Sequence, residues 1–204
     1  MVDEINRSDI IKLILVGESG TGKTNIITVG AGHKFEEGTL TTTSCSYIQK
    51  KIIKNNKEYR VNLWDTVGQE KYRSLTKIFV KDSNIVIFVY DITNRSTFES
   101  LNYWKKIIFD ILGNDLTLGV IGNKVDLYLQ EQVKEIEGKE YADSIGAKFK
   151  LTSAKDNPTD IADFIELMLD EYLKKSKNKK TKSRRETVSI KKQDGENKEE
   201  GGCC

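Results

Sequence analysis

Short apolar runs alternate with stretches of helical periodicity along most of this chain. The apolar runs predict strands near residues 10–16, 45–54, 58–64, 84–90, 116–122 and 147–152. The intervening patterns predict helices over residues 23–31, 72–80, 96–111, 131–145 and 158–175. Such alternation is typical of a mainly parallel sheet with crossover helices. We therefore predict an α/β fold: a doubly wound, mixed sheet of six strands, five parallel and one antiparallel, with helices on both faces.

Turn and cap residues refine this prediction. Residues 54–57 (Lys-Asn-Asn-Lys) favour a tight turn, so the second and third strands should form the antiparallel hairpin. Gly30 and Gly32 predict that the first helix ends early. The last helix has an N-cap candidate in Asn157 and the chain's one proline, Pro158, in its first turn. Its apolar face is typical of a core helix and contains Ile161, Phe164, Ile165, Met168, Leu169 and Tyr172.

The segment between the first strand and the first helix carries candidate chemistry. Residues 17–24 are Gly-Glu-Ser-Gly-Thr-Gly-Lys-Thr, the phosphate-binding P-loop pattern. Glycines allow several backbone N–H groups to point at one anion, and the following helix adds its positive dipole end. We expect Lys23 to contact the outer phosphates and Thr24 to offer its hydroxyl to Mg²⁺. A glycine-rich turn without a ligand is the alternative, which the preceding strand disfavours.

A second motif indicates which base is bound. Residues 123–126 (Asn-Lys-Val-Asp) end an apolar run, and open α/β sheets bind ligands at the carboxyl ends of their strands. Asp126 can accept hydrogen bonds from the N1–H and the exocyclic amine of guanine. Adenine lacks that donor pair and would leave the carboxylate desolvated and unpaired. Alone this motif is weak, but behind a P-loop it predicts a guanine nucleotide.

Two further segments follow strands and fit the same site. Asp65 begins the run Asp-Thr-Val-Gly-Gln over residues 65–69. We expect Asp65 to hold Mg²⁺ through water and the Gly68 N–H to meet the γ-phosphate. Residues 152–155 (Thr-Ser-Ala-Lys) follow a short strand and can offer a backbone N–H to the guanine oxygen.

With these motifs in place, residues 9 to about 173 resemble the small Ras-like GTPases, and the Rab branch most closely. Residues 64–70 (Trp-Asp-Thr-Val-Gly-Gln-Glu), 71–76 (Lys-Tyr-Arg-Ser-Leu-Thr) and 89–93 (Val-Tyr-Asp-Ile-Thr) are similar to Rab segments, as is the terminal Cys203-Cys204. The resemblance implies a P-loop NTPase-type fold. It also implies a switch in vesicle and membrane trafficking, in which GTP and Mg²⁺ order two segments and hydrolysis releases them.

The spacing typical of this family assigns two further residues. Counted from Thr24, the switch I threonine is Thr42, although Thr41 and Thr43 flank it. The guanine-stacking aromatic is Phe35, for which a place on the core is the alternative.

The resemblance then implies a full set of site residues. The catalytic residues are Gln69, which orients the attacking water, and Lys23. Mg²⁺ is expected on Thr24, Thr42 and Asp65. GTP or GDP is expected to contact Ser19, Gly20, Thr21, Gly22, Lys23, Thr24, Asn25, Phe35, Thr42, Gly68, Asn123, Lys124, Asp126, Ser153, Ala154 and Lys155. No residue matches a built-in arginine finger, so fast turnover should need a partner that contributes about 10³–10⁵ in rate.

Two departures from the Rab pattern bear on activity. Rabs typically have Ala where this chain has Val67, and an Ile-Gly-Val-Asp-Phe-like run where residues 43–47 are Thr-Ser-Cys-Ser-Tyr. We therefore expect slow hydrolysis and altered effector contacts. A non-hydrolysing, membrane-recruited binding module is one rival, which Val67 favours and Gln69 disfavours. A P-loop kinase or ATPase is the other, which residues 123–126 disfavour.

The remainder of the chain suggests how the protein reaches a membrane. We expect one globular domain over residues 1–173 and a disordered tail over residues 174–204, because eight basic and no acidic residues lie between Lys174 and Arg185 without apolar periodicity. A solvated flexible segment is the alternative. Cys203-Cys204 resembles the Rab ending that receives two geranylgeranyl groups, and a disulfide or metal pair there lacks partner ligands.

We find no secretory signal, no myristoylation start and no apolar run approaching the length of a membrane span. The resemblance implies an exchange factor, a GTPase-activating protein, a GDP-dissociation inhibitor or escort protein, and GTP-dependent effectors. We expect a monomer without a nucleic-acid partner, at the cytoplasmic face of an intracellular membrane and cycling with the cytosol.

Overall fold

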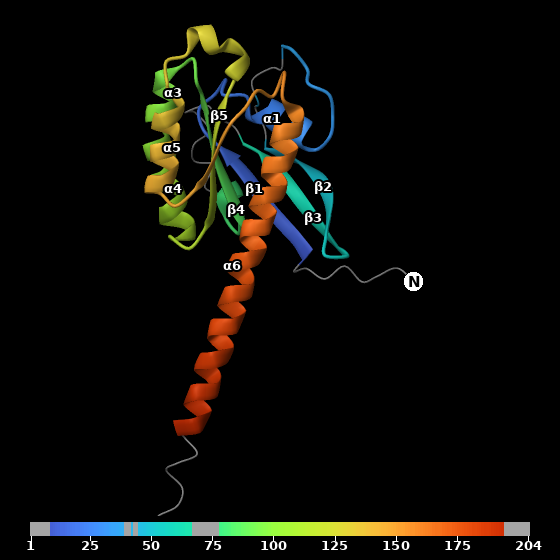
Figure 1. Ribbon diagram of the computed structural model, residues 1–204, viewed down its shortest axis with the longest axis vertical. Coiled ribbons are helices and arrows are strands. Elements are labelled where there is room, and N and C mark those ends of the chain that lie inside the picture. Colours follow the sequence, from blue (N-terminus) through green and yellow to red (C-terminus); the bar gives the residue numbers. More distant parts are fainter. Residues whose placement is uncertain (1–8, 39–41, 43–44, 67–77, 194–204) are drawn as a thin grey trace, which may run out of the picture.

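The protein forms a six-stranded sheet with helices packed on both faces (Figure 1). This computed structural model describes residues 9–38, 42, 45–66 and 78–193. The strands are β1 (Ile10–Val16), β2 (Ser46–Lys54), β3 (Lys57–Asp65), β4 (Ile85–Asp91), β5 (Thr117–Asn123) and β6 (Lys148–Leu151), in the spatial order β2-β3-β1-β4-β5-β6. β2 is antiparallel to β3, and every other neighbouring pair is parallel. The predicted fold is confirmed.

Two hydrophobic cores hold the layers together. On one face lie α1 (Lys23–Gly30) and α6 (Pro158–Gln193), and on the other α3 (Arg95–Glu99), α4 (Leu101–Leu112) and α5 (Glu135–Ser144) (Figure 1). Successive side chains of β1 point to opposite faces, so Leu13 and Leu15 join the α1/α6 core, while Ile14 and Val16 join the other. All seven residues of β4 are buried, as expected for a strand covered on both faces.

The hairpin between β2 and β3 follows its sequence signal. Asn55 and Asn56 adopt φ angles of 52° and 59°, the left-handed conformation that a two-residue hairpin turn requires. Lys54 and Lys57 form the closing pair of the ladder. The antiparallel hairpin across residues 54–57 is therefore confirmed.

Two helices begin or divide differently from the sequence prediction. The helix predicted over residues 96–111 is divided at Ser100 into α3 and α4. The helix predicted over residues 131–145 begins only at Glu135, because the Gln132 and Val133 N–H groups donate to the Ile92 carbonyl at 2.8 and 3.1 Å. The short 3₁₀ helix η3 (Val125–Gln130) occupies the stretch after β5. The helix predicted over residues 72–80 lies largely outside the described residues.

The largest difference concerns the basic tail. Helix α6 continues to Gln193, so the predicted helix end at residue 175 and the disorder predicted from Lys174 are wrong for residues 174–193. This stretch contains no glycine or proline to stop a helix, and lysine and arginine are good helix formers. This part of α6 extends away from the domain (Figure 1). Residues 194–204 lie outside the described residues.

Across the described ranges, no helix has the length and apolar character needed to cross a membrane.

Candidate functional site

The loop from β1 to α1 depends on two glycines. Gly17 and Gly22 have φ angles of 152° and 91°. A Cβ on Gly17 would collide with the Val89 carbonyl of β4, and one on Gly22 with the Asn123 side-chain amide at the end of β5. Only glycine therefore allows this loop to lie against the carboxyl ends of the neighbouring strands, where its N–H groups can face a ligand.

Lys23, the first residue of α1, is folded over this loop. Its Nζ donates to the Gly17 carbonyl at 2.9 Å and to the Glu18 carbonyl at 2.7 Å. Burial lowers the pKa of Lys23 from 10.5 to about 8, although the carboxylates of Asp65 and Glu18 oppose the shift. An ammonium held this way is costly to keep charged, and a phosphate group would stabilise the charge.

Three oxygen-bearing side chains from separate segments meet beside Lys23. Thr24 Oγ1 donates to Asp65 Oδ2 at 2.7 Å, Thr42 Oγ1 lies 3.2 Å from the same oxygen, and the two hydroxyls are 2.8 Å apart. Burial raises the pKa of the Asp65 carboxyl, and the hydrogen bonds from both threonines oppose the shift. Asp65 Oδ1 is buried and has no hydrogen-bond partner among the described residues. These groups fit Mg²⁺, which prefers oxygen ligands and few protein carboxylates.

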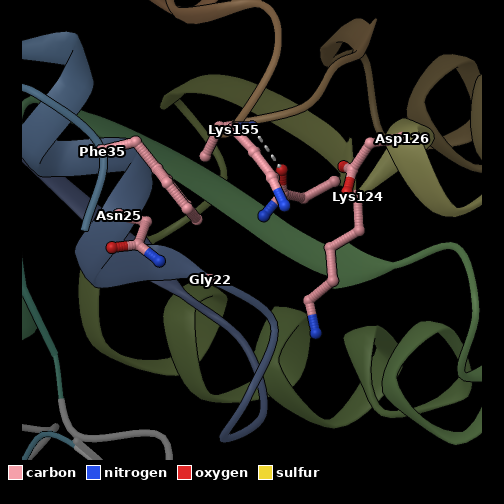
Figure 2. A pocket seen from close by; sticks show the side chains of 8 residues that line it. Gly22, Asn25, Phe35, Lys124, Asp126 and Lys155 are labelled. Atoms are coloured by element: carbon pink, nitrogen blue, oxygen red, sulfur yellow. Dashed lines mark hydrogen bonds between the residues drawn. The ribbon is translucent and has the colours of Figure 1, made fainter. Parts of the chain in front are cut away.

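A pocket of about 100 Å³ lies between the P-loop and the loops that follow β5 and β6 (Figure 2). Its lining consists of Gly22, Asn25, Phe35, Asn123, Lys124, Asp126, Ala154 and Lys155. Phe35 is half-buried and also packs on the α1/α6 core. A place on the core and a place in the pocket lining are therefore compatible for this residue. At the mouth of the pocket, Lys155 Nζ pairs with Glu37 Oε1 at 2.6 Å.

Asp126 is oriented by a hydroxyl behind it. Ser153 Oγ donates to Asp126 Oδ1 at 2.6 Å. The same Oγ accepts the N–H groups of Lys155 and Asp156 at 3.2 and 3.1 Å. Its acceptor sites are thus used by backbone donors, and its proton is directed at the carboxylate.

Asn123 uses both ends of its side-chain amide within the protein. Its Nδ2 donates to the Thr21 carbonyl at 2.9 Å, and its Oδ1 accepts the Ala154 N–H at 3.1 Å. The Ala154 N–H therefore bonds to the Asn123 side chain. Asn123 is 2% exposed, and a buried amide must use both its donor and its acceptor. Asn123 joins the P-loop to the loop after β6.

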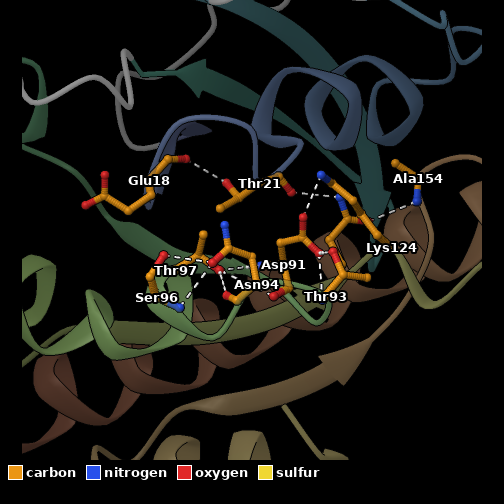
Figure 3. A network of polar contacts seen from close by, with 10 residues as sticks. Glu18, Thr21, Asp91, Thr93, Asn94, Ser96, Thr97, Lys124 and Ala154 are labelled. Carbon is orange, nitrogen blue, oxygen red and sulfur yellow. Dashed lines mark hydrogen bonds and ion pairs between the residues drawn. The ribbon is translucent and has the colours of Figure 1, made fainter. Parts of the chain in front are cut away.

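The structure adds two residues, Asp91 and Trp104, to those predicted from the sequence. Asp91, the last residue of β4, pairs with the Lys124 ammonium at 2.6 Å (Figure 3). Trp104 of α4 is fully buried and donates its indole N–H to Glu18 Oε1 at 3.2 Å. Asp91 had an available signal, because it ends an apolar strand at the same edge of the sheet as residues 123–126. The Trp104 contact had none, since the two residues are far apart in sequence.

The remaining predicted residues divide into two groups. Thr21 is buried and donates its hydroxyl to the Glu18 carbonyl at 3.0 Å, while Ser19 and Gly20 are exposed at the tip of the P-loop. Gly68, Gln69, Cys203 and Cys204 lie outside the described residues.

Comparisons with known proteins agree with this geometry. The protein-family model described as "Ras family" matches residues 12–174 of this chain. The protein named Ras-related protein Rab-21 from Mus musculus is 34% identical over 206 residues, which cover 97% of this chain and 93% of that protein. Rab-21 from Bos taurus is 39% identical over 151 residues, 74% of this chain and 68% of that protein. Ras-related protein Rab-2B from Dictyostelium discoideum is 36% identical over 166 residues, 81% of this chain and 82% of that protein.

Proposed function

The chain belongs to the Ras family, as a Rab-type small GTPase, and from this membership we propose how its own residues bind GTP and support its hydrolysis. Proteins of this type bind GTP and GDP with Mg²⁺, hydrolyse GTP to GDP and act in membrane trafficking. Exchange factors, activating proteins, dissociation inhibitors and effectors are the general partners of the family. The observation that carries the residue-level proposal is that Lys23, the Asp65 cluster and the Asp126 pocket lie along one edge of the sheet.

We assign the phosphates to the P-loop. Lys23 and the backbone N–H groups of residues 19–25 hold them. Thr24 and Thr42 bind Mg²⁺, and Asp65 supports it. When bound, Mg²⁺ neutralises the charge that develops on the phosphates. The nearly buried ammonium of Lys23 supports this assignment, because its hydrogen bonds at 2.7 and 2.9 Å are with neutral carbonyls and a bound phosphate would offset the burial that lowers its pKa.

We assign the base to the pocket of Figure 2, where Phe35 and Lys155 line its sides and Asp126 accepts the two donors of guanine. Asn123 and Ser153 keep this wall in place through their hydrogen bonds to Thr21, Ala154 and Asp126.

The experiment that tests this function is single-turnover phosphate release from bound GTP. We propose that Gln69 orients the attacking water and that Val67 crowds the turn that brings the Gly68 N–H to the γ-phosphate. Two extra methyl groups in a packed turn cost roughly 1–3 kcal/mol, and each 1.36 kcal/mol in a barrier is about tenfold in rate. Val67→Ala should therefore raise intrinsic hydrolysis, while Gln69→Leu should lower it.

Wild-type protein that binds GTP and releases no phosphate, even with an activating protein, would identify a non-hydrolysing binding module instead. If Val67→Ala changes neither hydrolysis nor nucleotide exchange, the turn accommodates valine and the crowding argument is wrong.

We further propose that residues 1–173 act as a monomeric switch domain and residues 174–204 as its membrane attachment, at the cytoplasmic face of an intracellular membrane. Two prenyl chains on Cys203 and Cys204 would anchor stably, since each buried CH₂ contributes about 0.8 kcal/mol and a single short chain anchors only marginally. Each Lys or Arg close to an anionic leaflet adds about 1 kcal/mol. Deletion of both cysteines should therefore make the protein wholly soluble.

Membrane fractionation with mass spectrometry of the C-terminal peptide measures this. The matched control neutralises the basic residues between 174 and 185, which should weaken membrane association without abolishing it. Both variants should retain nucleotide binding, because the pocket lies elsewhere in the fold. Unmodified cysteines on membrane-bound protein from its native cell would contradict the lipid anchor.

A further inference from the structure

Asp91 is a buried carboxylate at the carboxyl end of β4. Its side chain is 8% exposed, and its backbone pairs in register with Asn123 of β5. Oδ1 accepts the Thr93 N–H at 2.8 Å and the Thr93 hydroxyl at 2.7 Å, and Oδ2 pairs with the Lys124 ammonium at 2.6 Å (Figure 3). A buried carboxylate needs such partners, and Lys124 is its cationic one.

The turn that follows β4 fixes Asp91 from its other side. The Asp91 N–H donates to Thr97 Oγ1 at 3.0 Å, and that hydroxyl donates to the Asn94 carbonyl at 2.7 Å. The Asn94 side chain in turn caps α3 by accepting the Ser96 N–H at 3.1 Å. The position of Asp91 is therefore set by the start of α3, a part of the fold that does not line the base pocket.

Lys124, in contrast, lines the pocket and needs an anchor. Its backbone is left-handed, with φ 72°, and its side chain is 32% exposed. A lysine side chain has four rotatable bonds, so without a partner its stem would leave the pocket wall for much of the time. The ion pair with Asp91 removes that freedom before a ligand arrives, and such preorganisation raises affinity.

We propose that Asp91 is a positioning residue for nucleotide binding: through its ion pair it holds the Lys124 side chain along the wall of the guanine pocket and slows nucleotide release. The inference rests on the proposed function, because it needs the pocket to hold a guanine nucleotide.

Asp91→Asn removes the negative charge and keeps the size of the side chain. An asparagine keeps the shape and the Oδ1 acceptor for Thr93, but its amide donors then face the Lys124 ammonium. Release of a fluorescent GDP analogue should be about tenfold faster than from the wild type, a factor discounted for the partial exposure of Lys124. The matched control is Glu137→Gln, which makes the same chemical change in another ion pair. Glu137 pairs with Arg95 at 2.6 Å, and neither residue lines the pocket. This control should leave release unchanged.

A double-mutant cycle separates positioning from simple support of the fold. Lys124→Met removes the ammonium and keeps most of the apolar stem, and it too should speed release. In the Lys124→Met background, Asp91→Asn should add little or nothing, because its effect acts through that ammonium. Thermal unfolding of each variant checks the fold. If Asp91→Asn does not fold, Thr93→Val removes one donor to Asp91 and should speed release about twofold to threefold, again only when Lys124 is present.

Equal acceleration by the Asp91 or Thr93 change in both backgrounds would mean that Asp91 supports the turn and not Lys124, and the inference would be overturned. A folded Asp91→Asn variant with wild-type release would overturn it as well. A wild-type protein that does not retain the GDP analogue at all would contradict the proposed function itself, which is a different outcome.

Discussion

An Asp126→Asn variant is expected to prefer xanthine nucleotides, whereas the wild type prefers guanine nucleotides. The Ser153 hydroxyl donates to Asp126 Oδ1 at 2.6 Å and has its acceptor sites occupied by two backbone N–H groups. It can therefore face only the oxygen of the new amide, and the amide nitrogen must point into the pocket. There its donors would meet the two donors of guanine, whereas xanthine presents an acceptor in place of the amine.

Displacement of a fluorescent GDP analogue by GTP, XTP and ATP measures this switch. Two mismatched, desolvated hydrogen bonds should lower the affinity of the variant for GTP by at least about a hundredfold. The wild type should be displaced by GTP and XTP in that order of strength and hardly by ATP. Asp156→Asn is the matched control, since Asp156 neighbours Ser153 but does not line the pocket, and it should keep the guanine preference. Equal displacement of the wild type by ATP and GTP would instead favour a general P-loop NTPase.

A Lys23→Met variant should lose nucleotide affinity while its nucleotide-free fold becomes no less stable. The Lys23 ammonium would make charge-assisted hydrogen bonds to the phosphates, so its removal should lower the affinity for GDP by at least about a hundredfold. In the nucleotide-free protein, burial lowers the pKa of Lys23, which means that the charged form costs folding free energy. Equilibrium titration with GDP measures the affinity, which should fall in Lys23→Met. Urea unfolding of nucleotide-free protein measures the free energy of unfolding, which should rise or stay the same.

The same residue gives a pH dependence of known direction. Between pH 8 and 10.5 the unfolded chain keeps the Lys23 proton and the folded, nucleotide-free protein releases it, so the free energy of unfolding should rise with pH in this window. Phosphate binding needs the ammonium, so GDP affinity should fall as pH rises through about 8. The complex of Lys23→Met with GDP contains every other titrating group of the wild-type complex, including guanine itself. It should therefore lack only the loss of affinity that is due to Lys23. A wild-type affinity whose pH profile matches that of Lys23→Met would contradict the assignment.

Local pattern was sufficient for the fold and for the chemical class of the site. The P-loop over residues 17–24 and the Asn-Lys-Val-Asp run over residues 123–126 are contiguous, and each follows an apolar strand. Parallel strands end at one edge of a sheet, so these motifs had to meet there. The same holds for the hairpin at residues 54–57, whose turn is specified by its own four residues.

Helix ends were less predictable, because they depend on contacts as well as on propensity. Hydrogen bonds to the Ile92 carbonyl hold Gln132 and Val133 outside α5, and no local signal in residues 131–134 announces those bonds. In the tail, the absence of an apolar stripe predicts disorder. Residues 174–193 instead continue α6, since nothing in their composition stops a helix.

The sequence by itself determined that a guanine nucleotide, its phosphates and Mg²⁺ would be bound at the carboxyl edge of an α/β sheet, because each group needed for this lies in a short motif. Only the tertiary structure decided which partners the polar groups of these motifs have within the protein. The Ala154 N–H bonds to Asn123, and the Lys124 ammonium pairs with Asp91. Buried polar groups must find partners wherever the fold brings them together. These partners lie 31 and 33 residues away in the sequence, so no local pattern shows which residues pair.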